Sequence, residues 1–173
     1  MALELNGTTG VSLVQDGVVT AADLASGAIT SAALPAGSVL QVVRASGGGQ
    51  ESTTSSTYSA TNITATITPT SASSKLLVMP FVDGVYSAGG ANVIVNFRLY
   101  RDGSNIGNFG AAGQSSSIGT LVLGACAGSF YVDSSSTSPT TFTVYFSSQF
   151  DTATVLHSTY SAVSSIVIME IAG

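Results

Sequence analysis

The stretch Thr61-Asn-Ile-Thr-Ala-Thr-Ile-Thr68 alternates between polar and apolar side chains from Asn62 onward. Ile63, Ala65 and Ile67 share one side of an extended chain, and Asn62, Thr64, Thr66 and Thr68 share the other, which is the period of a half-buried β-strand. Pro69 and the Ser/Ala residues behind it end the run. We therefore expect a strand here, with one face in a protein core.

Similar strand patterns continue on both sides of this stretch, at 39–43, 76–82, 93–99, 106 onward, 118–132, 142–146 and 165–171. Asp102-Gly103 predicts a hairpin turn between two of them. About seven to nine strands separated by Gly/Ser/Thr loops, without a helix, predict an all-β, antiparallel, jelly-roll-like β-sandwich over residues 38–173. Expected core members are Ile63, Val78, Phe97, Leu99, Phe142, Val144 and Ile168.

Charged residues are scarce in the 173-residue chain: nine acids and four Lys or Arg residues, with a net charge of −5. This composition argues against a nucleic-acid binder and against binding to an anionic membrane surface, because both need basic residues. The 45% of apolar residues argues against disorder. A surface of Ser and Thr suits a strand-rich chain whose area is covered by partners.

The first residues, Met1 to Gly7, have neither the basic region nor the apolar region of a secretion signal. No apolar run approaches the ~20 residues of a membrane span. Cys126 is the single cysteine and lies in an apolar strand pattern, so we expect an inert core thiol rather than a disulfide. These features predict folding in a reducing cytoplasm.

A ten-residue repeat precedes the β-rich region. Gly17-Val-Val-Thr-Ala-Ala-Asp-Leu-Ala-Ser26 is followed by Gly27-Ala-Ile-Thr-Ser-Ala-Ala-Leu-Pro-Ala36, and a third copy begins at Gly37. Large apolar residues recur every five positions, which fits neither a helix nor a strand. So short a unit cannot bury them alone. We expect an oligomer interface formed by Val19, Leu24, Ile29, Leu34 and Val39; the alternative is a flexible, Ala-rich linker.

Residues 1–16 are polar and Gly-rich, with short apolar pieces on either side of a turn at 6–10. They have the character of an arm that pairs with something outside its own domain. The predicted organisation is thus an attachment arm over 1–16, a repeat stalk over 17–37 and a β-sandwich domain over 38–173. The candidate attachment residues are Leu3, Leu5, Val11, Leu13 and Val14.

With Val19-Thr-Ala-Ala-Asp-Leu-Ala25 and Ile29-Thr-Ser-Ala-Ala-Leu34, the repeat resembles segments of small tail-fibre, head-fibre and capsid-decoration proteins of tailed bacteriophages. Ile67-Thr-Pro-Thr-Ser-Ala-Ser-Ser-Lys-Leu-Leu-Val78, Phe97-Arg-Leu-Tyr-Arg-Asp-Gly-Ser-Asn-Ile-Gly107 and Ile168-Met-Glu-Ile-Ala-Gly173 extend the resemblance over most of the chain. It implies a virion structural protein, homotrimeric, with an N-terminal attachment arm and an outward β-domain. Only two full repeats favour a decoration (cement) protein or short head fibre over a long tail fibre.

Catalytic patterns are weak. His157 is the only histidine, and its proximity to Asp151 and Ser158 means little in a chain so rich in serine. We expect a polar loop histidine. Asp83, Asp102 and Asp133 read as loop residues that serve turns rather than paired catalytic acids. No Cys/His cluster has metal-ligand spacing, so we expect no enzyme activity, no cofactor and no metal.

Tyrosines leave a second function open. Their rings are suited to stack on host-surface glycans, although tyrosine is also an ordinary strand residue whose hydroxyl end can reach water. The six are Tyr58, Tyr86, Tyr100, Tyr131, Tyr145 and Tyr160. The expected partners are therefore further copies of the chain, a major capsid protein or another virion component, and a host glycan as the alternative. A bacterial surface adhesin is disfavoured by the missing secretion signal.

Overall fold

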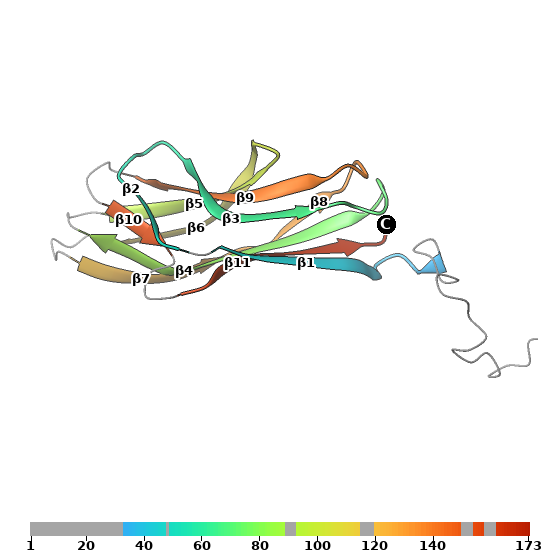
Figure 1. Ribbon diagram of the computed structural model, residues 1–173, viewed down its shortest axis with the longest axis horizontal. Coiled ribbons are helices and arrows are strands. Elements are labelled where there is room, and N and C mark those ends of the chain that lie inside the picture. The colour runs from blue at the N-terminus through green and yellow to red at the C-terminus, as the bar shows by residue number, and fades with distance from the viewer. Residues whose placement is uncertain (1–32, 48, 89–92, 115–119, 150–153, 158–161) are drawn as a thin grey trace, which may run out of the picture. The chain divides into compact units, whose positions relative to one another are not determined.

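A computed structural model describes residues 33–47, 49–88, 93–114, 120–149, 154–157 and 162–173 (Figure 1). The chain divides into two units, 1–35 and 36–173. All described strands belong to the second unit, and no α-helix occurs among the described residues. None of the described residues forms a helix long and apolar enough to cross a membrane. The arm over 1–16 and nearly all of the repeat stalk lie outside the described residues and stay predictions.

The second unit is all-β and antiparallel, as expected (Figure 1). Its strands are β1 (Val39–Gly47), β2 (Glu51–Thr53), β3 (Ser59–Ile67), β4 (Lys75–Ala88), β5 (Val93–Arg101), β6 (Ser104–Gln114), β7 (Thr120–Ala127), β8 (Phe130–Asp133), β9 (Thr140–Ser148), β10 (Thr154–His157) and β11 (Ser164–Ile171). They form a seven-stranded sheet and a four-stranded sheet of order β3-β9-β5-β6.

The seven strands of this sheet lie in only four rows, because three of the rows hold two shorter strands end to end instead of one long strand. β4 runs through the sheet unbroken, with β11 and then β10 along one side and β8 and then β7 along the other. β1 pairs with β11, and β2 pairs with β10. The row order is therefore β1/β2, β11/β10, β4, β8/β7. Two four-row sheets connected in this order make the eight-stranded jelly roll that the sequence predicted.

The core lies between the two sheets. Every core member expected from the sequence is fully buried, namely Ile63, Val78, Phe97, Leu99, Phe142, Val144 and Ile168. Strand β3 shows why: its exposure alternates residue by residue from Thr61 to Ile67, with the apolar residues inside. The ring of Phe97 stacks on those of Phe109 and Phe146, with centroids 5.9 and 6.5 Å apart, so aromatic contacts add to the area that each ring buries.

The Asp102-Gly103 turn is confirmed. Arg101 pairs with Ser104 across it, and both turn residues have positive φ, 49° and 81°, as a two-residue type I′ hairpin requires. The Asp102 carboxylate also accepts a hydrogen bond of 2.8 Å from the backbone N–H of Thr141. This bond ties the hairpin to the neighbouring strand β9.

Four details differ from the expectation, one of which is that Asp133, expected in a loop, is the last residue of strand β8. The segment 47–57 holds the short strand β2, and His157 ends strand β10 instead of lying in a loop. Their pairing joins Glu51 to His157 across some hundred residues of chain, and strands of three and four residues are too short to show an alternating pattern. Asp83 lies inside β4 at a register shift, where its carboxylate accepts a 2.7 Å bond from Gly84 N–H. It shapes a bulge, not a loop.

Candidate functional site: two unlike faces of the sandwich

The seven-stranded sheet turns an apolar face away from the core. Strand register sets Val42 opposite Met169, Met169 opposite Leu77, and Leu77 opposite Tyr131. A parallel row joins Val167 to Met79, and Phe81 follows two residues later on β4. We call these residues the outer apolar face: Val42, Leu77, Met79, Phe81, Tyr131, Val167 and Met169. Antiparallel sheets that face water normally carry polar residues there.

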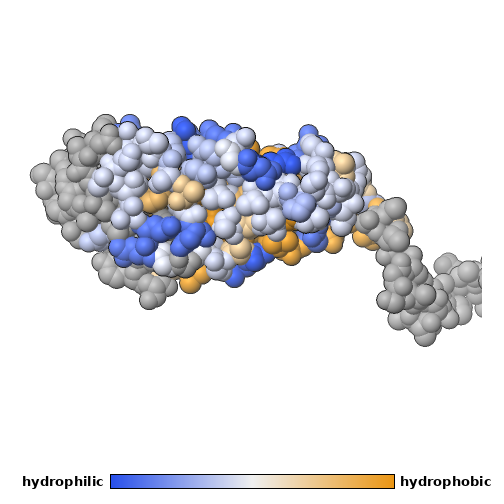
Figure 2. Space-filling view, turned by 45° about the horizontal axis from the view of Figure 1, so that its top comes forward, coloured by the Kyte–Doolittle hydropathy of each residue, from blue (hydrophilic) through white to orange (hydrophobic). Residues whose placement is uncertain are grey.

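Several of these side chains are exposed. Tyr131 is 62% exposed, Val42 56% and Phe81 38%, and Val39 at the start of β1 is 51% exposed. Figure 2 shows hydrophobic side chains at the surface along the lower flank of the domain, beside largely polar ones. Contiguous apolar area of this kind marks an interaction site on a soluble protein, whereas single exposed apolar residues do not.

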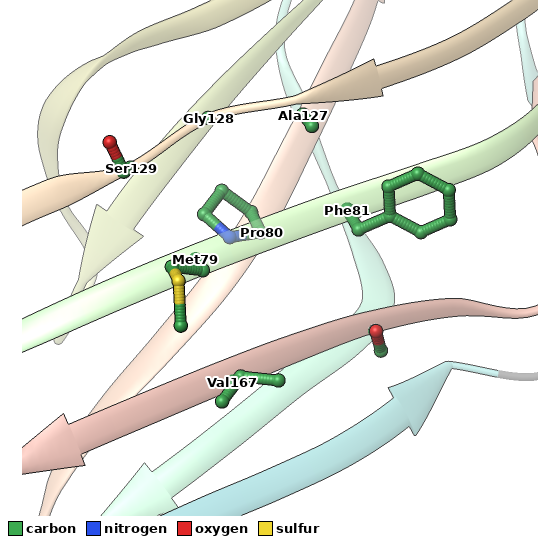
Figure 3. A pocket seen from close by; sticks show the side chains of 8 residues that line it. Met79, Pro80, Phe81, Ala127, Gly128, Ser129 and Val167 are labelled. Atoms are coloured by element: carbon green, nitrogen blue, oxygen red, sulfur yellow. The ribbon is translucent and has the colours of Figure 1, made fainter.

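The face contains an open hollow of about 470 Å³. Figure 3 shows Met79 and Phe81 from β4, Val167 from β11, Ala127 from the end of β7, and Gly128 just after it, around the hollow. Pro80, Ser129 and Ser165 complete the lining, and none of the lining residues is charged. The hollow therefore suits an inserted apolar side chain and offers no acid, base or nucleophile arrangement for catalysis.

Charges stand at the border of the outer apolar face. Lys75 and Asp133 are cross-strand partners and form an ion pair. The hydrogen bond to Asp133 and its negative charge raise the pKa of Lys75. Arg44 lies on β1, paired in register with Val167, and has no acidic partner among the described residues. Because β1 is the last strand on its side of the sheet, this charge also lies at an edge.

The four-stranded sheet presents the opposite character. Threonine hydroxyls pair across its outside, Thr64 with Thr143 at 3.0 Å and Thr66 with Thr141 at 2.8 Å. Such a surface keeps its own polar groups satisfied and remains compatible with water. The two outer faces of one sandwich thus differ sharply: one is polar, and the other is apolar.

An aromatic cluster lies on this polar sheet. The rings of Tyr100 and Tyr145 stack with centroids 3.8 Å apart, and the Arg98 guanidinium lies 3.9 Å from the ring centroid of Tyr58. Arg98 and Tyr145 are cross-strand partners, which makes the four side chains one cluster. Arg98 Nε also donates a 2.7 Å bond to Asn108 Oδ1. We call this group the tyrosine–arginine cluster.

A buried glutamate lies at the end of the domain where β1 begins. Glu170 is 0% exposed. Its Oε1 accepts bonds from Thr70 N–H (2.8 Å), Thr70 Oγ1 (2.9 Å) and Ser71 N–H (3.2 Å), and its Oε2 accepts one from Gln41 Nε2 (2.6 Å). Burial by itself would raise the pKa of Glu170, but the bonds from Gln41 and Thr70 outweigh it and lower the pKa. The carboxylate is thus a structural anchor.

The structure places few of the residues predicted as sites from the sequence. Leu34 and Val39 are described and are 38% and 51% exposed. Val19, Leu24 and Ile29 lie outside the described residues, as do the candidate attachment residues Leu3, Leu5, Val11, Leu13 and Val14. Of the five residues predicted to form the oligomer interface, the structure therefore describes only the last two.

Residues singled out for chemistry are dispersed. Cys126 is buried, and burial raises the pKa of its thiol. Of the six tyrosines, Tyr58, Tyr100 and Tyr145 meet on one face, Tyr86 and Tyr131 lie on the other sheet, and Tyr160 is outside the described residues. In the described part of the chain, no group of three or more His, Cys, Asp or Glu side chains is placed to hold a metal ion.

The outer apolar face was not predicted from the sequence, although a signal for it exists. Leu76-Leu-Val-Met79 and Ile166-Val-Ile-Met169 are apolar at every position. An antiparallel strand with one face in water alternates between apolar and polar residues. Unbroken apolar runs therefore indicate a strand that is covered on both sides. The core covers one side of β4 and β11, and their other side forms the outer apolar face.

The sequence matches no family model and has no significant similarity to a curated protein. Among solved structures, the chain is similar to the VP2 subviral particle of infectious bursal disease virus, with 12% identity and a TM-score of 0.41 over 77% of this chain and 37% of that one. It is also similar to T=1 particles derived from infectious bursal virus, with 11% identity and a TM-score of 0.40 over 77% and 36% of the two chains. The chain spans little more than a third of the length of these proteins.

Proposed function

We propose that this chain is a non-enzymatic structural protein of a tailed-bacteriophage virion. In this proposal it is a homotrimer, made in the host cytoplasm and attached to the particle surface through its N-terminal arm with the β-domain outward. Its role is that of a capsid-decoration (cement) protein or a short head fibre. The partners are its own copies and the major capsid protein or another virion component, and the proposal involves no cofactor, nucleic acid or membrane.

One observation carries the proposal: the sandwich has one apolar and one polar outer face. A domain with this asymmetry is built to be covered on one side and displayed on the other. The repeat before it and the resemblance of its motifs to phage fibre and decoration proteins support the same role. The jelly roll is compatible with it, since viral capsid and lectin domains both use this fold, but a fold alone does not assign a function.

The location on the particle is the direct test of this role. Antibodies against the β-domain, or cryo-microscopy of whole particles, should place the protein on the virion surface. Particles lacking it should lose resistance to heat or osmotic shock if it acts as cement. Absence from purified particles would contradict the virion role, and unchanged particle stability would contradict the cement role alone.

The tyrosine–arginine cluster favours one alternative function, a tail-fibre-type module that binds host-surface glycans. Tyr100 and Tyr145 are partly exposed on the polar sheet, and aromatic rings beside hydrogen-bonding groups are common features of ligand sites. Under this alternative the polar face is turned toward the host surface.

A glycan array probed with the full-length chain tests the alternative. If the cluster binds sugars by stacking, Tyr100→Ala should weaken binding at least about tenfold, which corresponds to about 1.4 kcal/mol. Tyr100→Phe keeps the ring and serves as the matched control that should still bind. An array without any binding, or binding that survives Tyr100→Ala, would contradict glycan recognition at this cluster.

A further inference from the structure

We infer that the outer apolar face packs against the β-domains of other copies of this chain. This inference rests on the proposed homo-oligomer and adds the surface by which the β-domains associate. It commits to further copies of the chain as the occupant of that face, in preference to a capsid protein or a glycan.

Continuity with the repeat is the first argument. Val39 is the last member of the five-residue series that begins at Val19, and in the structure it begins strand β1. It is 51% exposed, and Val42, three residues further along the same strand, is 56% exposed. The last member of the apolar series is therefore an exposed residue of the same strand that carries Val42.

The size and shape of the face are the second argument. Covering a large aromatic side chain removes about 150–250 Å² from water, so Phe81 and Tyr131, at 38% and 62% exposure, offer about 200 Å² between them. Five further apolar residues surround them. A standard interface buries about 800 Å² per partner around an apolar centre. The face is large enough to be that centre, and its hollow can receive a partner's side chain.

The charges permit this burial. Lys75 and Asp133 neutralise each other at the border, and Arg44 lies on the terminal strand of the sheet, where its head group can stay in water. No carboxylate lies among the seven residues of the face. Covering these seven residues therefore buries no charge of their own, and Arg44, opposite Val167, must keep its head group in water at the sheet edge.

Proximity decides in favour of further copies over another partner. Copies held together by the repeat would face each other at an effective concentration of about millimolar, as for modules joined by short linkers. Every copy carries the same apolar face, and a face left open would promote aggregation. Contact between copies covers all of them at once.

Thiol labelling of the full-length chain tests this surface. Cys126 is buried and has a raised pKa, so it gives a low background with maleimides. Val42→Cys and Tyr131→Cys each place one thiol on the outer apolar face, and Thr66→Cys is the matched control on the polar sheet. In the assembled protein we expect the two face thiols to react at least about tenfold more slowly than the control thiol.

A second arm separates the possible failures. Adding Ile29→Asp to dissociate the copies should raise the labelling rate of the face thiols to that of Thr66→Cys. Face thiols that label as fast as the control while native mass spectrometry shows an intact oligomer would overturn this inference alone. Protection that persists in the dissociated protein would overturn it too, because the cover would then lie within one copy. An unmodified chain that is monomeric would overturn the proposed homo-oligomer itself.

Discussion

Glu170→Ala is expected to lower the free energy of unfolding by about 3 kcal/mol. The carboxylate accepts bonds from Thr70, Ser71 and Gln41, and hydrogen bonds to a charged group contribute about 1.5–3 kcal/mol. Removing the side chain leaves these donors without an acceptor and opens a cavity at a fully buried position. The loss should be measured by denaturant unfolding at neutral pH and at one fixed protein concentration, because assembly also shifts stability.

Acid should remove the same contribution from the unmodified protein. The bonds to Glu170 lower its folded-state pKa, so its stabilisation is fully present above the unfolded value of about 4.3 and is lost as the pH falls through the folded pKa. Glu170→Gln keeps the shape but cannot titrate, so the stability difference between wild type and this variant should shrink below about pH 4. If Glu170→Ala unfolds within about 0.5 kcal/mol of the wild type at neutral pH, the anchor role is wrong.

Ile29→Asp is expected to weaken the oligomer at least about a hundredfold. If Ile29 lies at the interface of the repeat, each copy then carries a carboxylate into an apolar contact, and a buried unpaired charge costs several kcal/mol. The carboxylates of the copies also repel one another. Leu24→Asp should act in the same way, and sedimentation equilibrium over a range of concentrations measures both changes.

Ser26→Asp is the matched control for the repeat. It adds the same charge three residues away, outside the five-residue apolar series, and should leave assembly intact. Equal weakening by Ser26→Asp would mean that net charge, not burial, sets the effect. If Ile29→Asp and Leu24→Asp both assemble like the wild type, the repeat is a linker and the interface lies elsewhere.

Much of the β-domain follows from local sequence. The alternation of Thr61–Thr68 predicts strand β3 and its buried face, and Asp102-Gly103 predicts the hairpin between β5 and β6, because both signals lie within a few residues of chain. Gly124 lies within β7 with a φ of +95° at a register shift. A glycine signal alone does not distinguish a bulge from a strand end.

The features on which the proposed functions rest depend on long-range contacts. Tyr58, Arg98 and Tyr145 come from three separate segments, and only the register of the sheet brings them together. Glu170 is also unpredictable from its neighbours, since its acceptor role depends on a loop a hundred residues earlier. The outer apolar face could have been anticipated from the unbroken apolar runs of β4 and β11, but only strand order shows that both runs lie side by side on one surface.

The assembly of the unmodified chain is the claim on which the rest depends. Native mass spectrometry of the full-length protein at micromolar concentration measures it directly. The account predicts a species of three times the 17.2 kDa of a single copy. A single-copy mass under the same conditions would contradict it.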